Sequence, residues 1–134
     1  MLSPDLCTEE EISRLVHAFY ATVHRDAMLG PIFAAHVKDW DSHLPKMVDF
    51  WSSVLRRTAR YRGTPMPAHV ALPGLTSALF QRWLSLFHAG TAAQPNTALR
   101  ECADEMAERI AQSLWYGYQL HRRPDGLPDE LTVP

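Results

Sequence analysis

A stretch rich in proline and glycine, residues 63–74, most strongly limits what this chain can form. Two prolines and a glycine precede His69, and a Pro-Gly pair follows it. These residues break regular structure on both sides of the histidine, so only a short helical piece over residues 66–72 fits between them. Long amphipathic patterns flank the stretch. We therefore expect His69 to face whatever the flanking helices enclose.

Two interpretations of His69 remain open at this level. The histidine is either the axial ligand of a bound metal cofactor or a core residue whose ring nitrogens are satisfied within the protein. The spacing of its neighbours alone favours the core residue.

Composition and charge narrow the class of protein. The 134 residues suffice for one domain with a real core, and 46% apolar with 21% charged residues is ordinary for a globular chain. A formal net charge of −2 gives no reason to expect binding to nucleic acid or to an anionic membrane. No apolar run approaches the roughly 18 residues that a membrane span needs. Cys7 and Cys102 form no CxxC unit, which favours a reducing, cytoplasmic location without disulfides or a thiolate zinc site.

Capping signals and apolar periodicity predict four substantial helices. Their expected limits are Thr8 to about Arg25, Ser42 as N-cap to Gly63 as C-terminal stop, Thr76 as N-cap to about Gly90, and about residues 97–120. A short helix or a turn is expected at Gly30-Pro31, and no segment alternates like a strand. The sequence thus predicts an all-α protein with one domain over residues 1–120 and a flexible tail over residues 121–134.

Several familiar chemistries lack their sequence patterns. The chain has no Glu-x-x-His pair for a di-iron bundle, no G-x-S-x-G nucleophile elbow and no glycine loop that would cradle phosphate. Three polar groups instead lie on otherwise apolar helix faces, those of Tyr20, His43 and Trp83. A haem with a polar diatomic ligand would satisfy all three together. Each residue also has a simpler explanation when it is considered alone. Tyr20 could donate to a backbone carbonyl, His43 could be exposed to solvent, and Trp83 could serve only for packing.

A set of motifs, in one order and spacing over about residues 12–120, is similar to the group III truncated haemoglobins. The residues that carry the similarity are Phe19-Tyr20, Leu29-Gly30-Pro31-Ile32-Phe33, Trp40-x-x-His43, Phe50-Trp51, Tyr61-x-Gly63-x-Pro65-x-x-x-His69-x-x-Leu72-Pro73 and Trp83-Leu84-x-Leu86-Phe87. The Tyr–Gly–Pro–His run together with the later Trp-Leu-x-Leu-Phe is the most specific part. The glycine pairs typical of other truncated groups are missing.

The resemblance implies a two-over-two helical sandwich that encloses a b-type haem, iron protoporphyrin IX. It implies His69 as the proximal ligand of the iron, and Tyr20, His43 and Trp83 as distal residues. Met47 matches an apolar residue over the haem. Further cofactor contacts are expected from Phe33, Trp51, Tyr61, Leu72 and Leu114. Pro45, placed at the third helical position, leaves open whether His43 points inward or toward solvent.

An arginine-rich stretch at residues 56–62 has two interpretations. Arg56 and Arg60, with Tyr61 between Arg60 and Arg62, could pair with the anionic haem propionates. The same cations could instead be solvated charges that complement the negative end of a helix. The sequence favours neither.

Three functions follow from these expectations. The first is a haem protein that binds dioxygen, nitric oxide or carbon monoxide. The second is a haem enzyme that uses the same pocket for nitric oxide dioxygenation or peroxide turnover, with an external reductase because 134 residues hold no reductase domain. The third is a helical interaction module without a cofactor. Whether the protein is an enzyme stays open.

Overall fold

The first helix begins at its predicted capping box. In this computed structural model, the hydroxyl of Thr8 accepts a hydrogen bond from the amide of Glu11 at 3.0 Å, and the Glu11 carboxylate accepts one from the amide of Thr8 at 2.9 Å. Two amides that the first turn leaves without helical partners are thereby satisfied. The helix then runs to Arg25, as its apolar spacing predicts.

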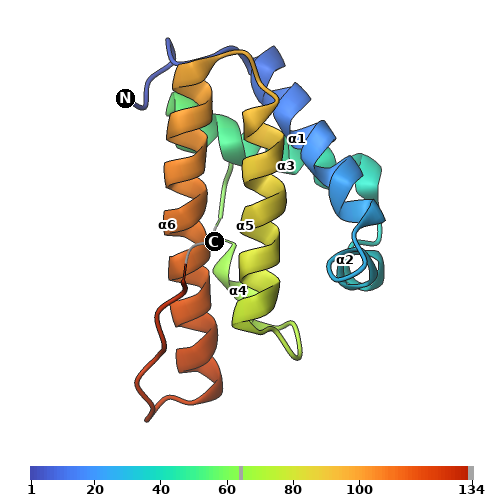
Figure 1. The fold of residues 1–134 in the computed structure, drawn as a ribbon, viewed down its shortest axis with the longest axis vertical. Coiled ribbons are helices and arrows are strands. Elements are labelled where there is room, and N and C mark those ends of the chain that lie inside the picture. The colour runs from blue at the N-terminus through green and yellow to red at the C-terminus, as the bar shows by residue number, and fades with distance from the viewer. Residues whose placement is uncertain (64, 133–134) are drawn as a thin grey trace.

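The structure describes residues 1–63 and 65–132. Helices follow one another along this part of the chain (Figure 1): α1 (Glu9–Arg25), α2 (Gly30–His36), α3 (Trp40–Arg56), α4 (Met66–Val70), α5 (Ser77–Ala92) and α6 (Thr97–Arg122). The described ranges contain no strand, so the predicted all-α class is confirmed. None of their helices is both long and apolar enough to cross a membrane.

Two pairs of helices enclose the core. Helices α5 and α6 lie side by side along the long axis of the molecule, and α1 packs on α3 and also on α5 (Figure 1). Large apolar side chains from both pairs are fully buried, among them Ile12, Leu15, Phe19, Leu55, Leu84, Phe87 and Leu99. Burial of each such side chain contributes about 1.5–3 kcal/mol. Among the described helices, the short helix α4 packs against α6, at one side of this core.

Helix α3 begins earlier than predicted. The N-cap is Asp39, whose carboxylate accepts a hydrogen bond from the amide of Ser42 at 3.3 Å, so Ser42 lies inside the helix. Asp39 and Ser42 are both good N-cap residues, and the sequence pattern did not separate them. Pro45 consequently lies within the helix, where its missing amide removes one helical hydrogen bond.

Helix α3 also ends earlier than predicted, at Arg56 instead of Gly63. The backbone of Arg57 takes the left-handed conformation with φ 58°, and that of Ala59 does so with φ 57°. Residues other than glycine adopt this conformation rarely. The sequence around Arg57 therefore did not indicate that the helix ends there. The amide of Tyr61 then donates to the hydroxyl of Ser53 at 2.8 Å, which ties the following link back to α3.

The tail, expected to be flexible, packs against α5 and α6 as far as residue 132. The amide of Asp129 donates to Oε1 of Gln119 at 2.8 Å, and Nε2 of Gln119 donates to the carbonyl of Asp129 at 2.9 Å. Leu131 is only 3% exposed, and its amide donates to Gln112 at 3.1 Å. The predicted boundary at residue 120 falls inside α6, and residues 129–132 contact α5 and α6.

Candidate functional site

One large cavity lies between the two halves of the fold. Its volume is about 690 Å³, within the range of roughly 300–1,000 Å³ that small-molecule and cofactor pockets occupy. Every helix contributes to its walls: Tyr20 from α1, Phe33 from α2, His43 from α3, His69 from α4, Trp83 from α5 and Leu114 from α6. Chain segments far apart in the sequence thus converge on one space.

His69 forms one wall of the cavity together with Ala68 and Leu72. Its Nδ1 atom lies 2.8 Å from the carbonyl oxygen of Pro65. Because a carbonyl oxygen only accepts hydrogen bonds, this contact requires the proton of the neutral ring to be on Nδ1. Nε2 then carries the free lone pair. A histidine held in this way is typical of metal ligation, where the second nitrogen is bound by a backbone carbonyl or a carboxylate.

Three polar side chains line the cavity apart from this wall. Tyr20 is buried and Trp83 half-buried, and neither makes a side-chain hydrogen bond to a residue within 1–63 or 65–132. Nε2 of His43 is buried and likewise has no partner in the described chain. Leaving a buried group such as Nε2 of His43 unpaired costs about 1–3 kcal/mol. The three side chains line the same cavity, and a polar ligand there could accept hydrogen bonds from them.

Burial moves the pKa values of two of these groups further from pH 7. It raises the pKa of the Tyr20 hydroxyl, which is protonated at pH 7 even at its ordinary value of about 10. Burial, followed by the nearby charge of Lys46, lowers the pKa of His43. The imidazole therefore stays neutral at pH 7. Both side chains can then donate a hydrogen bond to a polar ligand without bringing a charge into the cavity.

Stacked aromatic rings form a rigid part of the cavity wall. Trp51 and Trp83 both stack on the ring of Phe87. The ring centroids of Trp51 and Phe87 are 4.8 Å apart, and those of Trp83 and Phe87 are 5.2 Å apart. Phe87 is 1% exposed. Aromatic packing of this kind holds the two tryptophans in place, and the adjoining surface suits a flat, apolar molecule.

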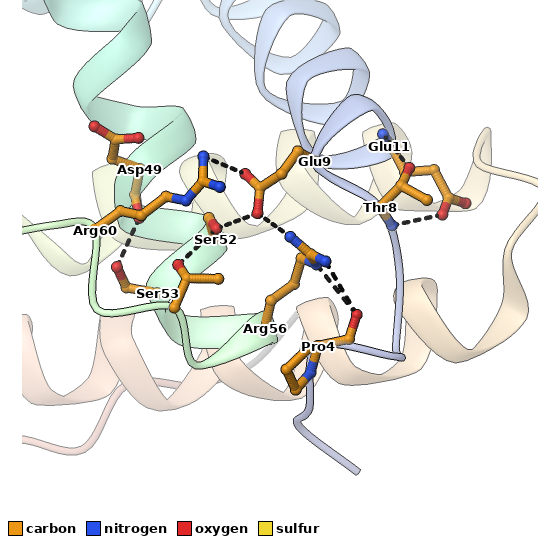
Figure 2. A network of polar contacts seen from close by, with 10 residues as sticks. Pro4, Thr8, Glu9, Glu11, Asp49, Ser52, Ser53, Arg56 and Arg60 are labelled. Carbon is orange, nitrogen blue, oxygen red and sulfur yellow. Dashed lines mark hydrogen bonds and ion pairs between the residues drawn. The ribbon is translucent and has the colours of Figure 1, made fainter.

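The structure brings ten of the twelve predicted site residues to the cavity: Tyr20, Phe33, His43, Met47, Trp51, Tyr61, His69, Leu72, Trp83 and Leu114. Arg56 and Arg60 lie elsewhere, beside the N-terminal turn of α1 (Figure 2). Pro45 does not turn His43 away, since Nε2 of that ring is buried at the cavity.

Arg56 and Arg60 both pair with Glu9. The Glu9 carboxylate contacts the guanidinium of Arg56, lies 3.4 Å from Nη1 of Arg60, and accepts a hydrogen bond from Ser52 at 2.6 Å (Figure 2). Arg56 also donates to the carbonyl of Pro4 at 3.3 and 3.2 Å. The predicted pairing of these arginines with haem propionates is therefore replaced by a contact that joins α1, α3 and the N-terminal segment.

Sequence reasoning missed the residues at the cavity rim. Lys38, Ser42 and Lys46 line the opening. Lys46 follows His43 by three residues, which is one helical turn on the same face, so its position beside His43 could have been read from the spacing. Lys38 lies in the link before α3, and no local pattern marks it.

Sequence reasoning also missed Tyr118 and Arg122 near the end of α6. Both contact the link that follows α4: Tyr118 bonds Leu72 and Leu75, and Arg122 bonds Leu72 and Val70. These partners are more than 40 residues away in the sequence, so helical periodicity alone could not reveal them.

Known proteins with the same geometry identify the family. No protein-family model matches the chain. A group 3 truncated hemoglobin of Campylobacter jejuni is 31% identical over 120 residues, which cover 84% of this chain and 94% of that protein. The crystal structure of a group III truncated hemoglobin from Campylobacter jejuni matches with a TM-score of 0.76 at 26% identity, covering 93% of this chain and 99% of that one. The chain therefore belongs to the group III truncated haemoglobins, a family of two-over-two helical globins that bind haem.

Proposed function

We propose that the cavity holds a b-type haem with Nε2 of His69 as the axial ligand of the iron, and that it binds a diatomic gas on the opposite face. The observation that carries this proposal is the hydrogen bond from Nδ1 of His69 to Pro65, which leaves Nε2 as a free electron-pair donor in a cavity that is also lined by His43, whose buried Nε2 has no partner in the described chain. The haem supplies the coordination position for dioxygen, nitric oxide or carbon monoxide.

The residues around the cavity suit such a cofactor. The Trp51–Phe87–Trp83 stack and the side chains of Met47 and Leu114 provide the apolar contact that a porphyrin plane needs. The Pro65 carbonyl fixes the tautomer of His69 and makes its Nε2 more basic. Membership of a haem-binding family supports the same assignment.

Tyr20, His43 and Trp83 hold the diatomic ligand by hydrogen bonds. Tyr20 donates its hydroxyl proton, Trp83 its indole N–H, and His43 the N–H of a neutral imidazole. Burial raises the pKa of Tyr20 and lowers that of His43, so both shifts favour the neutral forms. The bond from His43 satisfies a buried nitrogen that has no partner within the described chain.

Lys38 and Lys46, instead of the arginines, pair with the haem propionates. Both lie at the rim of the cavity, where the anionic propionates of a haem would emerge toward solvent. Arg56 is engaged by Glu9 and Pro4. A lysine at an exposed rim pairs with a carboxylate as a flexible point charge.

A redox activity in the same pocket is the second candidate. The observation that favours it is the number of donors, since three hydrogen bonds slow the release of dioxygen and give time for chemistry. In nitric oxide dioxygenation, nitric oxide and dioxygen combine with one electron from an external reductase to give nitrate. Mixing the oxygenated protein with nitric oxide and measuring nitrate tests this candidate.

Absorption spectra test the haem assignment. Purified protein supplied with haem should develop a Soret band, and His69→Ala should lose or strongly alter it because the axial ligand is gone. His121→Ala is the matched control, since His121 is exposed at the end of α6. If the spectrum of His69→Ala equals that of the wild type, His69 is not the ligand.

A further inference from the structure

Helix α4, which carries His69, cannot hold its own orientation. None of its five residues, all of which the structure describes, is buried. A single helical turn is also unstable by itself, because its few hydrogen bonds do not offset the cost of ordering it. The link that follows contains Gly74 with φ 71°, which turns the chain into α5. The direction in which His69 points must therefore be set by contacts from other elements.

The hydroxyl of Tyr118 on α6 bridges the two ends of this link. It donates to the carbonyl oxygen of Leu72 at 2.9 Å and accepts from the amide of Leu75 at 3.0 Å. Tyr118 is 5% exposed. One buried hydroxyl thus satisfies both a donor and an acceptor of a segment that has no regular structure of its own.

Arg122, one turn further along α6, binds the C-terminal end of α4. Its Nη2 atom donates to the carbonyl of Leu72 at 2.7 Å and to that of Val70 at 3.3 Å. The last carbonyls of a helix lack helical partners, and a cation at this end also complements the helix dipole. The guanidinium carbon lies 4.9 Å from the centre of the Tyr118 ring, so the two side chains support each other.

A short chain of hydrogen bonds joins these contacts to His69. The amide of Leu72 donates to the carbonyl of His69 at 3.1 Å, while the carbonyl of Leu72 is held by Tyr118 and Arg122. At the other end, the amide of His69 donates to Pro65 at 3.3 Å. The end of α4 is thus tied to α6 through the backbone of Leu72.

We propose that Tyr118 and Arg122 are positioning residues that form a clamp and set the orientation of the His69 imidazole toward the iron. The clamp rests on the proposed role of His69 as axial ligand. It acts through the backbone of Val70, Leu72 and Leu75, and neither clamp residue lines the cavity. The end of α6 thereby tunes the strength of the iron–histidine bond.

The iron–histidine stretching band in the resonance Raman spectrum of the reduced, ligand-free haem protein tests the clamp. We expect Tyr118→Phe, which keeps the ring and removes only the hydroxyl, to shift and broaden this band. Arg122→Gln should shift it in the same direction. Loss of two hydrogen bonds from Tyr118 should also speed haem dissociation roughly 5- to 10-fold.

Matched controls lie beside the clamp, with Tyr116 on α6 and Arg123 at its C-cap. Tyr116→Phe and Arg123→Gln alter the same residue types beside the clamp, and the side chains of Tyr116 and Arg123 make no hydrogen bond to a residue in the described ranges. Both controls should keep the wild-type band. If Tyr118→Phe and Arg122→Gln lower only the melting temperature and leave the band at its wild-type position, the clamp is merely structural and the proposal fails.

Two further outcomes separate the clamp from the haem assignment. If the wild type shows an iron–histidine band that depends on His69 while the clamp variants leave it unchanged, only the clamp is overturned. If the wild type shows no such band, both proposals fall. Amide hydrogen exchange gives a readout without the band: Leu75 should lose protection in Tyr118→Phe and keep it in Tyr116→Phe, and equal protection in both would contradict the clamp.

Discussion

The rings of Tyr20 and His43 meet edge to face in the cavity, with centroids 5.6 Å apart and planes 86° apart. This contact fixes the two polar tips of α1 and α3 relative to each other. Trp40 packs against both rings, at 5.6 Å from Tyr20 and 5.2 Å from His43. The contacts among these three rings therefore limit how far the side chains of Tyr20 and His43 can move.

Removal of one donor should speed the release of dioxygen. Tyr20→Phe and Trp83→Phe each remove a hydrogen bond worth about 0.5–1.5 kcal/mol, which corresponds to a roughly 2- to 12-fold faster off-rate. Stopped-flow displacement of dioxygen measures this rate, with Tyr116→Phe as the control. Unchanged off-rates in both variants would contradict the proposal that Tyr20 and Trp83 donate hydrogen bonds to the bound dioxygen.

The rim lysines, and not the arginines, should retain the haem. Lys46→Gln removes a charge at the cavity opening, and an exposed ion pair of about 0.2–1 kcal/mol corresponds to haem loss up to about fivefold faster. Arg56→Gln breaks the contact with Glu9 and Pro4 and should lower the stability while leaving the rate of haem loss unchanged. Transfer of haem to an excess of apomyoglobin measures both rates. Faster loss from Arg56→Gln alone would restore the arginine as the propionate partner.

Local patterns in the sequence were enough to predict most helices. The capping box of Thr8 and Glu11 and the N-cap at Thr76 are confirmed. These features were predictable because a cap and its partner lie within three residues of each other. The limits of α3 were wrong at both ends. Two competing cap residues stand at its start, and at its end Arg57 takes a left-handed conformation without glycine.

Contacts between distant segments account for what the sequence could not predict. Tyr20, His43 and Trp83 could be selected as candidates from the sequence, because each places a polar group on a helix face that is otherwise apolar. The contact between Arg56 and Glu9 was not predicted, since the two residues are 47 positions apart and helical spacing does not indicate such a pair. Tyr118 and Arg122 escaped notice for the same reason: their partners lie 43 to 52 residues away.

Acid should weaken the contact between Asp26 and Arg82. The Asp26 carboxylate accepts hydrogen bonds from Arg82 at 2.8 Å, from Leu29 at 2.9 Å and from Met28 at 3.0 Å. The bond from Arg82 is the main cause that holds the pKa of this carboxyl below its ordinary value. A lowered pKa in the folded state means that the stabilisation is present above the unfolded value of about 3.9 and is lost as the pH falls through the folded value.

Asp26→Asn should therefore lower the free energy of unfolding at pH 7 by about 1–3 kcal/mol. The difference from the wild type should shrink as the pH falls below about 4. Urea titrations at a series of pH values measure this difference, and Asp125→Asn, at an exposed position, is the control. A difference that stays constant down to the lowest pH would show that the charge of Asp26 does not contribute.

Substitutions of two leucines in the tail test whether the tail packs against the folded protein. Leu131 is 3% exposed, whereas Leu127, four residues earlier, is 93% exposed. If the tail is part of the folded unit, Leu131→Ala should destabilise the protein by about 2–3 kcal/mol, at the lower end for a buried leucine because the site lies at the surface of the core. Leu127→Ala should change the free energy of unfolding by less than about 0.5 kcal/mol. Urea unfolding of both variants measures the contrast, and equal effects would mean that the tail does not pack as the structure shows.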